Sequence, residues 1–143
     1  MNKQTLKELY LKYELTKDDV YKHQHYVIIT RSGIEKIQAI ANIQVQFEAK
    51  VLEKDFAVIK ATGYVAAKQV METYGSALKG STFKDGNTNT WYVAEMAEKR
   101  ALSRAVLKVT GFYQLGVFGE DESEDFKKKK YNTKEKLQTL TNK

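Results

Sequence analysis

The segment Ile43-Gln-Val-Gln-Phe-Glu-Ala-Lys-Val51 alternates apolar and polar residues along its whole length. Because successive side chains of a β-strand point to opposite faces, this period of two predicts a strand with one apolar and one wet face. A turn at Glu53–Asp55 leads to a second predicted strand, Phe56–Val65, in which Gly63 is a candidate bulge. A third strand is expected over Lys68–Leu78, although the alanines before it and its methionine would also suit a helix. Short links between the strands predict antiparallel pairing.

A helix is predicted on each side of these strands. Ser32-Gly-Ile-Glu35 has the form of a capping box, in which serine and glutamate satisfy main-chain N–H groups at a helix start, and Asn42 ends the helix that it opens. A long helix is expected at about 90–110, closing at Gly111. Residues 79–90 before it are nearly all polar or glycine, and loops of that length are usually functional or disordered.

These elements predict an α+β fold, in which an antiparallel β-sheet of three to five strands is covered by the two helices. The uncovered face of the sheet, which carries Gln44, Gln46, Glu48 and Lys50, would be wet and open for binding. An oligonucleotide-binding (OB-like) β-barrel with added helices is the alternative, because four or five strands are enough for one.

The flanking segments are shorter and less regular. Apolar residues at helical spacing predict a helix over 5–14. Thr16–Asp19 has the form of a capping box for a short second helix ending near His23, and His25–Thr30 is a predicted strand. After the long helix, Phe112–Phe118 is expected to pack as a short extended segment.

The length and charge of the chain indicate one domain with an acidic partner. Residues 1–118 are expected to form a single nucleic-acid-binding domain, and residues 119–143 a charged, flexible C-terminal tail. The first of these segments holds 17 lysines and arginines against 12 aspartates and glutamates, so most of the net charge of +6 lies on the domain. A pI of about 9.3 favours nucleic acid as partner first and an anionic membrane surface second.

Other classes of function are excluded or disfavoured by what the sequence lacks. Without cysteine there is no disulfide, thiolate metal site or cysteine nucleophile, and two histidines disfavour a histidine-rich metal site. Neither a nucleophile elbow, a phosphate-binding loop nor a zinc-protease motif is present. We therefore expect no enzyme activity, no metal and no cofactor. No stretch approaches the ~18 apolar residues of a membrane span, so no membrane association and a cytoplasmic location are expected, in the host cell if the protein is viral.

Cationic and aromatic residues are interleaved through the predicted domain, as binding of single-stranded nucleic acid requires. Cations follow the phosphates, and aromatic faces stack on any base at ~1–3 kcal/mol each. On the long helix Arg100, Arg104 and Lys108 lie four residues apart, which places them in one stripe. A structural alternative stays open, in which the tyrosines belong to the core edge and Trp91 anchors the helix start. The candidate binding residues are Lys22, His25, Tyr26, Arg31, Lys60, Lys68, Tyr74, Lys79, Phe83, Lys84, Trp91, Tyr92, Lys99, Arg100, Arg104 and Lys108.

The long helix also carries a resemblance to known proteins. The segment from Trp91 to Lys108, followed by Gly111 and the acidic run Gly119–Phe126, resembles small phage proteins that bind single-stranded DNA. More distantly, Tyr74-Gly-Ser-Ala77 and Lys99-Arg-Ala-Leu-Ser-Arg-Ala105 are similar to a turn and a helix of the Sak/Erf-type single-strand annealing superfamily. The resemblance covers roughly residues 22–126. It implies a compact antiparallel sheet with helices and a basic groove for single-stranded DNA.

Together these observations predict a sequence-non-specific single-stranded DNA-binding protein of phage DNA replication or recombination. The nearest alternative is a single-strand annealing protein. An alternative of another class is an interaction adaptor that recruits replication or recombination proteins through Glu120–Asp125. RNA in place of DNA also stays open, because non-specific stacking does not sense the sugar.

Overall fold

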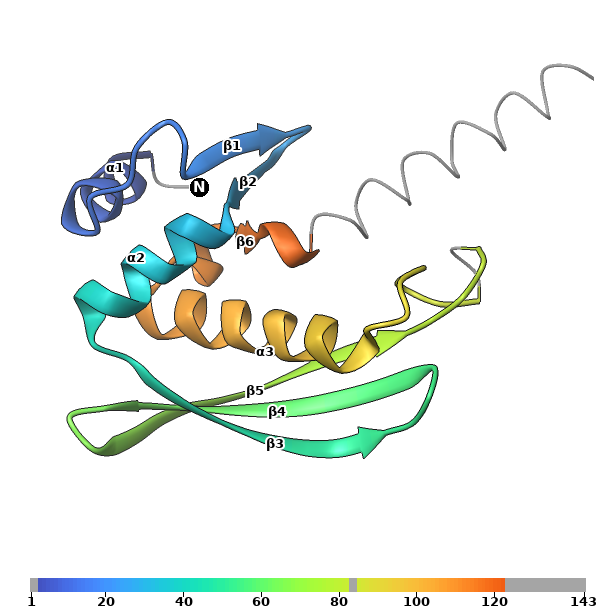
Figure 1. Cartoon of the computed structure of the whole chain (residues 1–143). Helices are drawn as coiled ribbons and strands as arrows, with labels where there is room; N and C mark the ends of the chain where they lie inside the picture. The colour runs from blue at the N-terminus through green and yellow to red at the C-terminus, as the bar shows by residue number, and fades with distance from the viewer. Residues whose placement is uncertain (1–2, 83–84, 123–143) are drawn as a thin grey trace, which may run out of the picture.

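A computed structural model of the protein describes residues 3–82 and 85–122 (Figure 1). In chain order its elements are α1 (Lys3–Lys12), β1 (Val20–His23), β2 (Tyr26–Ile29), α2 (Arg31–Ala41), β3 (Gln44–Leu52), β4 (Phe56–Val65), β5 (Lys68–Leu78), α3 (Val93–Thr110), the 3-10 turn η1 (Tyr113–Leu115) and β6 (Val117–Gly119). The fold is α+β, as predicted, and the named strands form two open sheets, not a closed barrel. No helix within the described ranges is long and apolar enough to cross a membrane.

The larger sheet has the strand order β3-β4-β5, and both of its strand pairs are antiparallel, as the short links predict. The alternation of β4 places Ala57, Ile59 and Ala61 on one face, where all three are buried. The β4–β5 register shifts at Gly63–Tyr64, so the predicted bulge is confirmed. The sequence pattern therefore identifies all three strands, but the predicted apolar face of β3 is only partly covered, since Phe47 is 40% exposed.

Helix α3 covers that face and runs close to the backbone of β5 (Figure 1). Its alanines Ala97, Ala101 and Ala105 are fully buried. A Cβ atom at Gly75 of β5 would stand only 2.1 Å from the carbonyl oxygen of Ala97 and 2.5 Å from the amide nitrogen of Ala101. Small residues on both elements thus let the two backbones meet. The helix ends at Gly111, whose φ of 91° is left-handed, as the predicted closing residue requires.

A second layer lies on the other side of α3 and contains α2 and the smaller sheet, of order β1-β2-β6 (Figure 1). Strand β6 pairs with β2 in parallel, so the predicted extended segment after α3 is confirmed in part. Apolar residues of this layer, such as Ile29 and Ile37, share a buried cluster with Leu6 of α1 and Phe112. The prediction that both helices cover the larger sheet is wrong for α2, which packs on α3 and β2.

The segment between α1 and α2 differs from the predicted helix that would end near His23. Thr16–Asp19 forms a turn that Asp19 stabilises through its own side chain, and β1 follows directly. The start of α2 also differs by two residues, because Thr30 and not Ser32 is the N-cap, and its hydroxyl oxygen accepts the N–H of Gly33 (3.2 Å). The end of α2 is as predicted, since Asn42 is its left-handed C-cap.

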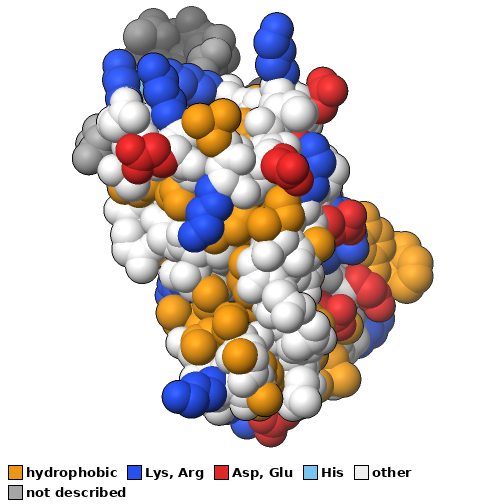
Figure 2. All heavy atoms as spheres, turned by 90° about the vertical axis from the view of Figure 1, so that its left-hand side faces the viewer, with side chains coloured by type: hydrophobic (Ala, Val, Ile, Leu, Met, Phe, Trp, Pro, Cys, Tyr) orange, Lys and Arg blue, Asp and Glu red, His pale blue; other side chains and the backbone are white. Residues whose placement is uncertain are grey.

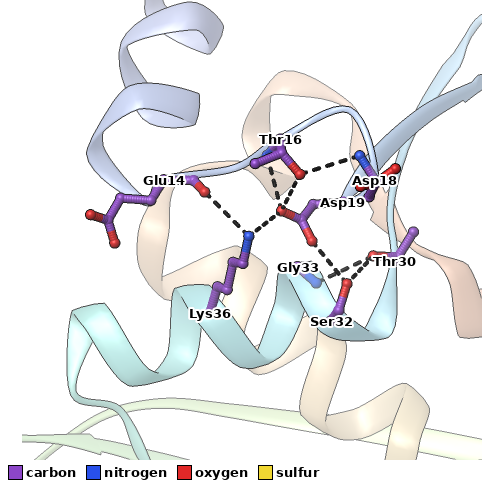
Figure 3. Close-up of polar contacts among 8 residues, drawn as sticks. All are labelled: Glu14, Thr16, Asp18, Asp19, Thr30, Ser32, Gly33 and Lys36. Carbon is purple, nitrogen blue, oxygen red and sulfur yellow. Dashed lines mark hydrogen bonds and ion pairs between the residues drawn. The ribbon is translucent and has the colours of Figure 1, made fainter.

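Asp19 ties this turn to α2 (Figure 3). One carboxylate oxygen accepts from Nζ of Lys36 (2.7 Å) and from the N–H of Thr16 (2.9 Å), and the other accepts from the hydroxyl of Ser32 (2.8 Å). Asp19 is only 2% exposed. Burial alone would raise the pKa of this carboxyl, but the hydrogen bonds, that of Lys36 foremost, lower the pKa to about 2. The network is therefore a structural junction with a charged centre.

Candidate nucleic-acid interface

The cationic stripe of α3 begins with an arginine that faces the protein interior. Arg100 is 1% exposed. Its guanidinium group donates to the main-chain carbonyls of Ser76 (2.8 Å), Asn87 (3.0 Å) and Asp121 (3.3 Å), which come from three separate segments. Its donors are directed into the fold, so Arg100 is not available to a phosphate, in contrast to the prediction from the stripe.

Arg104 repeats this contact one helical turn further along and explains the spacing of the stripe. Its Nη1 donates to the carbonyl of Tyr74 (2.7 Å), two residues before Ser76 on β5. Four residues of helix rise ~6 Å and two residues of strand ~6.8 Å, so arginines four apart match carbonyls two apart. Because β5 is an edge strand, these carbonyls have no neighbouring strand to pair with. The two arginines therefore close this edge of the sheet.

Arg104 nevertheless remains within reach of solvent, beside the main chain of an exposed tyrosine. Its side chain is 35% exposed, and Tyr74 is 49% exposed on the face of the sheet opposite α3. Lys60 of β4 lies directly opposite Tyr74 in the antiparallel register. We refer to Lys60, Tyr74 and Arg104 as the Tyr74 centre. Three candidates that are far apart in sequence thus lie near one another, Tyr74 and Arg104 at the β5 edge and Lys60 on the central strand β4.

Each cation of the Tyr74 centre has an acidic partner. Nζ of Lys60 lies 3.1 Å from Oε1 of Glu72, and this hydrogen bond, with further help from Glu48, raises the pKa of Lys60. Lys60 is therefore protonated at neutral pH. Nε of Arg104 pairs with Oε1 of Glu122. A phosphate bound here would compete with two carboxylates.

The larger sheet carries α3 on one face only (Figure 1). The other, uncovered face is polar at one end and apolar at the other. The predicted polar residues Gln44, Gln46, Glu48 and Lys50 are exposed. Nζ of Lys50 is 2.8 Å from Oε1 of Glu48, which leaves little excess positive charge there. Toward the turn between β3 and β4 the face is lined by Phe56, Val58 and Leu78. The uncovered face of the larger sheet is therefore better suited to contact bases than phosphates. Phosphate contacts would lie at the β5 edge.

The aromatic and basic residues around segment 79–90 lie at the other end of α3 from Lys108. Trp91 is 77% exposed, so it is not the helix anchor that the structural alternative proposed, whereas Tyr92 packs against the core of the larger sheet. Lys79 is exposed, and its N–H bonds to the carbonyl of Asp55 (2.7 Å). Phe83 and Lys84 lie outside the described residues.

The remaining predicted residues do not join the Tyr74 centre. Lys22, His25 and Tyr26 lie on the hairpin of β1 and β2, and Tyr26 stacks edge-on against Phe118 (5.6 Å between ring centroids). Nζ of Lys108 is 5.0 Å from the ring centroid of Tyr113. Lys68 begins β5 at the turn from β4. The candidate residues that the structure describes therefore form several groups and no single groove.

The end of the molecule that carries α1 and the β4–β5 turn shows the same scatter (Figure 2). Apolar side chains lie across the middle of this view, while one group of lysine and arginine side chains lies along its upper rim and others are scattered below it, next to acidic side chains. The described residues on this face therefore show no continuous basic surface, and the β5 edge remains the best-defined meeting point of cation and aromatic residue.

Arg31 and Lys99 form a second group, at a shallow hollow between α2 and α3 that is also lined by Ser103 and Asp121. The hydroxyl of Ser103 donates to Oδ2 of Asp121 (3.3 Å). Burial raises the pKa of Asp121, against the hydrogen bond from Ser103 and the charges of Lys99 and Arg31. Glu35 also lines the hollow, and its Oε1 lies 3.5 Å from Nε of Arg31, so the hollow combines two cations and a hydroxyl with two carboxylates.

The first residues of the acidic run pack against the domain. We refer to Glu120–Glu122 as the acidic clasp. Its side chains contact the N–H of Arg31 (2.9 Å), the hydroxyl of Ser103 and the guanidinium of Arg104. Glu122 is 6% exposed. The domain therefore extends past the boundary predicted near residue 119, and the rest of the predicted tail lies outside the described residues.

Sequence reasoning did not find the clasp or the burial of Arg100. The available signal was the opposite charge of two segments, the helix that carries Arg100, Ser103 and Arg104 and the acidic run Glu120–Glu122. The sequence does not show how far apart these side chains lie in the folded protein. The resemblance to phage single-stranded DNA-binding proteins and to the annealing superfamily is a prediction from motifs. Comparison with protein-family models, curated proteins and solved structures finds no match for the chain.

Proposed function

We propose that the protein binds single-stranded DNA without sequence preference, in the manner of proteins that serve phage DNA replication or recombination. The observation that supports this best is the Tyr74 centre, where the exposed ring of Tyr74 shares a sheet face with Lys60 and the main-chain carbonyl of Tyr74 accepts a hydrogen bond from Arg104. Bases would stack on Tyr74 and the neighbouring apolar face, while Lys60 and Arg104 hold the adjacent phosphates. Stacking on one ring and ion pairing to phosphates sense no base identity, hence the absence of sequence preference.

A substitution at Tyr74 tests this proposal. Tyr74→Ala should weaken binding of a labelled single-stranded oligonucleotide about 5- to 150-fold in a fluorescence anisotropy titration, since one stacked base contributes ~1–3 kcal/mol. Tyr64→Ala is the matched control, because Tyr64 lies on the same face but opposite two glutamines, Gln44 and Gln69. An equal loss in both variants would contradict a role specific to Tyr74.

A competition titration tests the preference for DNA over RNA, and the rate at which complementary strands pair tests the annealing alternative. Competition with unlabelled single-stranded DNA, duplex DNA and RNA of equal length ranks the three ligands. The proposal expects single-stranded DNA to compete at least tenfold better than the duplex, because paired bases are not free to stack. Accelerated pairing of complementary strands would instead favour the annealing function.

A further inference from the structure

The guanidinium of Arg104 reaches the surface with two of its three nitrogens already bound to the protein. Nε donates to Oε1 of Glu122, and Nη1 donates to the carbonyl oxygen of Tyr74 at 2.7 Å. Among the residues that the structure describes, none accepts a hydrogen bond from the third nitrogen, Nη2, and this atom is not buried. The N–H groups of Nη2 therefore remain for a ligand, on a side chain that is 35% exposed.

Both acceptors of Arg104 are packed parts of the fold. Glu122 is 6% exposed, and the main-chain carbonyl of the preceding residue, Asp121, accepts from the buried guanidinium of Arg100 (3.3 Å). The carbonyl of Tyr74 belongs to β5, which is paired with β4 on both sides of this residue. A planar guanidinium that is held at two nitrogens by fixed acceptors cannot turn freely. The direction of Nη2 is therefore set before any ligand binds.

The other cation of the Tyr74 centre is held less firmly. Nζ of Lys60 has its acidic partner, Glu72, at 3.1 Å, and the side chain of Glu72 is 42% exposed. An ammonium is also a point charge whose donors rotate about the last bond of a flexible stem. Lys60 therefore supplies charge to a phosphate without fixing its direction, whereas Arg104 supplies both.

We propose that Glu122 is a positioning residue for Arg104, which it orients so that Nη2 donates to an oxygen of a nucleic-acid phosphate. The proposal rests on the proposed function and adds to it the residue that prepares one phosphate contact. An arginine side chain has large rotational freedom, and here this freedom is lost on folding and not on binding, which increases the affinity. The carboxylate also opposes the charge of the phosphate, but water screens this repulsion at a partly exposed site. The gain from orientation exceeds this repulsion.

Two substitutions at position 122 separate the geometry of the contact from its charge. Glu122→Asp keeps the charge, but its side chain is one methylene shorter and no longer reaches Nε of Arg104. Glu122→Gln removes the charge and keeps an oxygen that accepts from Nε. In a fluorescence anisotropy titration of the full-length chain with a labelled single-stranded DNA oligonucleotide at low salt, Glu122→Asp should bind about two- to fivefold more weakly than the wild type. Glu122→Gln should bind at least as tightly as the wild type.

The matched controls are Glu98→Asp and Glu98→Gln, at an exposed position on α3. Glu98→Asp should leave the affinity unchanged, and any gain in Glu98→Gln measures the effect of net charge alone. A second readout is the salt dependence, which a purely structural role of Glu122 would not change. Loss of one phosphate contact should make the slope of log affinity against log salt concentration shallower by about 0.7 in Glu122→Asp.

A double-mutant cycle shows whether Glu122 acts through Arg104. Arg104→Gln keeps a polar side chain beside Glu122 and removes the cation, so it should weaken binding at least as much as Glu122→Asp does. Adding Glu122→Asp to Arg104→Gln should then have no further effect, because the residue that it orients is absent.

The outcomes separate this proposal from the proposed function. If the wild type binds DNA and Glu122→Asp binds it as tightly, the positioning role is overturned while the proposed function stands. The same conclusion follows if Glu122→Gln binds as weakly as Glu122→Asp, or if Glu122→Asp weakens binding equally in the Arg104→Gln background. If Arg104→Gln binds as tightly as the wild type, Arg104 holds no phosphate, and the positioning role and the phosphate contact of the proposed function are both overturned. Failure of the wild type to bind at low salt would overturn both proposals.

Discussion

Arg100 shows how a residue typical of nucleic-acid binding becomes part of the core. Arg100→Ala would leave the carbonyls of Ser76, Asn87 and Asp121 without their shared donor, so we expect a loss of about 2–4 kcal/mol in the free energy of unfolding. The control is Lys99→Ala, at the neighbouring half-buried position, which should change the free energy of unfolding by less than about 0.5 kcal/mol. Urea unfolding measures both, and an Arg100→Ala variant as stable as the control would contradict a structural role.

Asp19 predicts a dependence of stability on pH. Its pKa in the folded protein is about 2, below the ordinary value of 3.8, so the folded state holds the charged form more firmly than the unfolded state does. This contribution to stability is complete above pH 4 and is lost as the pH falls toward 2. Asp19→Asn should therefore destabilise the protein by ~1–3 kcal/mol at pH 7 and by much less near pH 2. Asp18→Asn, at an exposed neighbour, should have no such effect in thermal unfolding across this range.

Between elements, the close packing of α3 on β5 is the feature most sensitive to a single methyl group. Gly75→Ala would drive a Cβ into the backbone of α3, and we expect a loss of ~1–3 kcal/mol or more in the free energy of unfolding. Gly63→Ala is the matched control in β4, because its Cβ would meet nothing closer than 3.7 Å. A Cβ atom at Gly75 would stand 2.1 Å from the carbonyl oxygen of Ala97. Equal midpoints of urea unfolding for the two variants would contradict this close approach of α3 to β5.

The elements that could be predicted from sequence are those whose pattern is local. The period of two in Ile43–Val51 and the glycine at 111 predict a strand and a helix end without reference to the residues that they contact. Strand β1 has four residues, which are too few to show a period. The pairing of β6 with β2 depends on where the end of α3 lies in the fold, and the local sequence does not determine this. A helical pattern also indicates which side chains share a face but not how deeply they are buried, so Arg100 and Arg104 look alike in sequence and differ in the fold.

At the scale of the whole molecule, the positive charge of residues 3–82 and 85–122 does not form one groove. The candidate residues divide into the Tyr74 centre, the hollow at Arg31 and Lys99, the hairpin of β1 and β2, and the surroundings of Trp91. A strand of nucleic acid bound at the β5 edge would use the first group. This arrangement predicts few phosphate contacts and a modest dependence on salt.

The most direct measurement is therefore the affinity of the wild-type protein for a single-stranded DNA oligonucleotide over a series of salt concentrations. Trp91 is the only tryptophan and is exposed, so its fluorescence offers a second readout of the same titration. With about three phosphates contacted, the logarithm of the association constant should fall with the logarithm of salt concentration with a slope of about −2. Absence of binding at low salt, or an affinity that does not change with salt, would contradict phosphate binding at the Tyr74 centre.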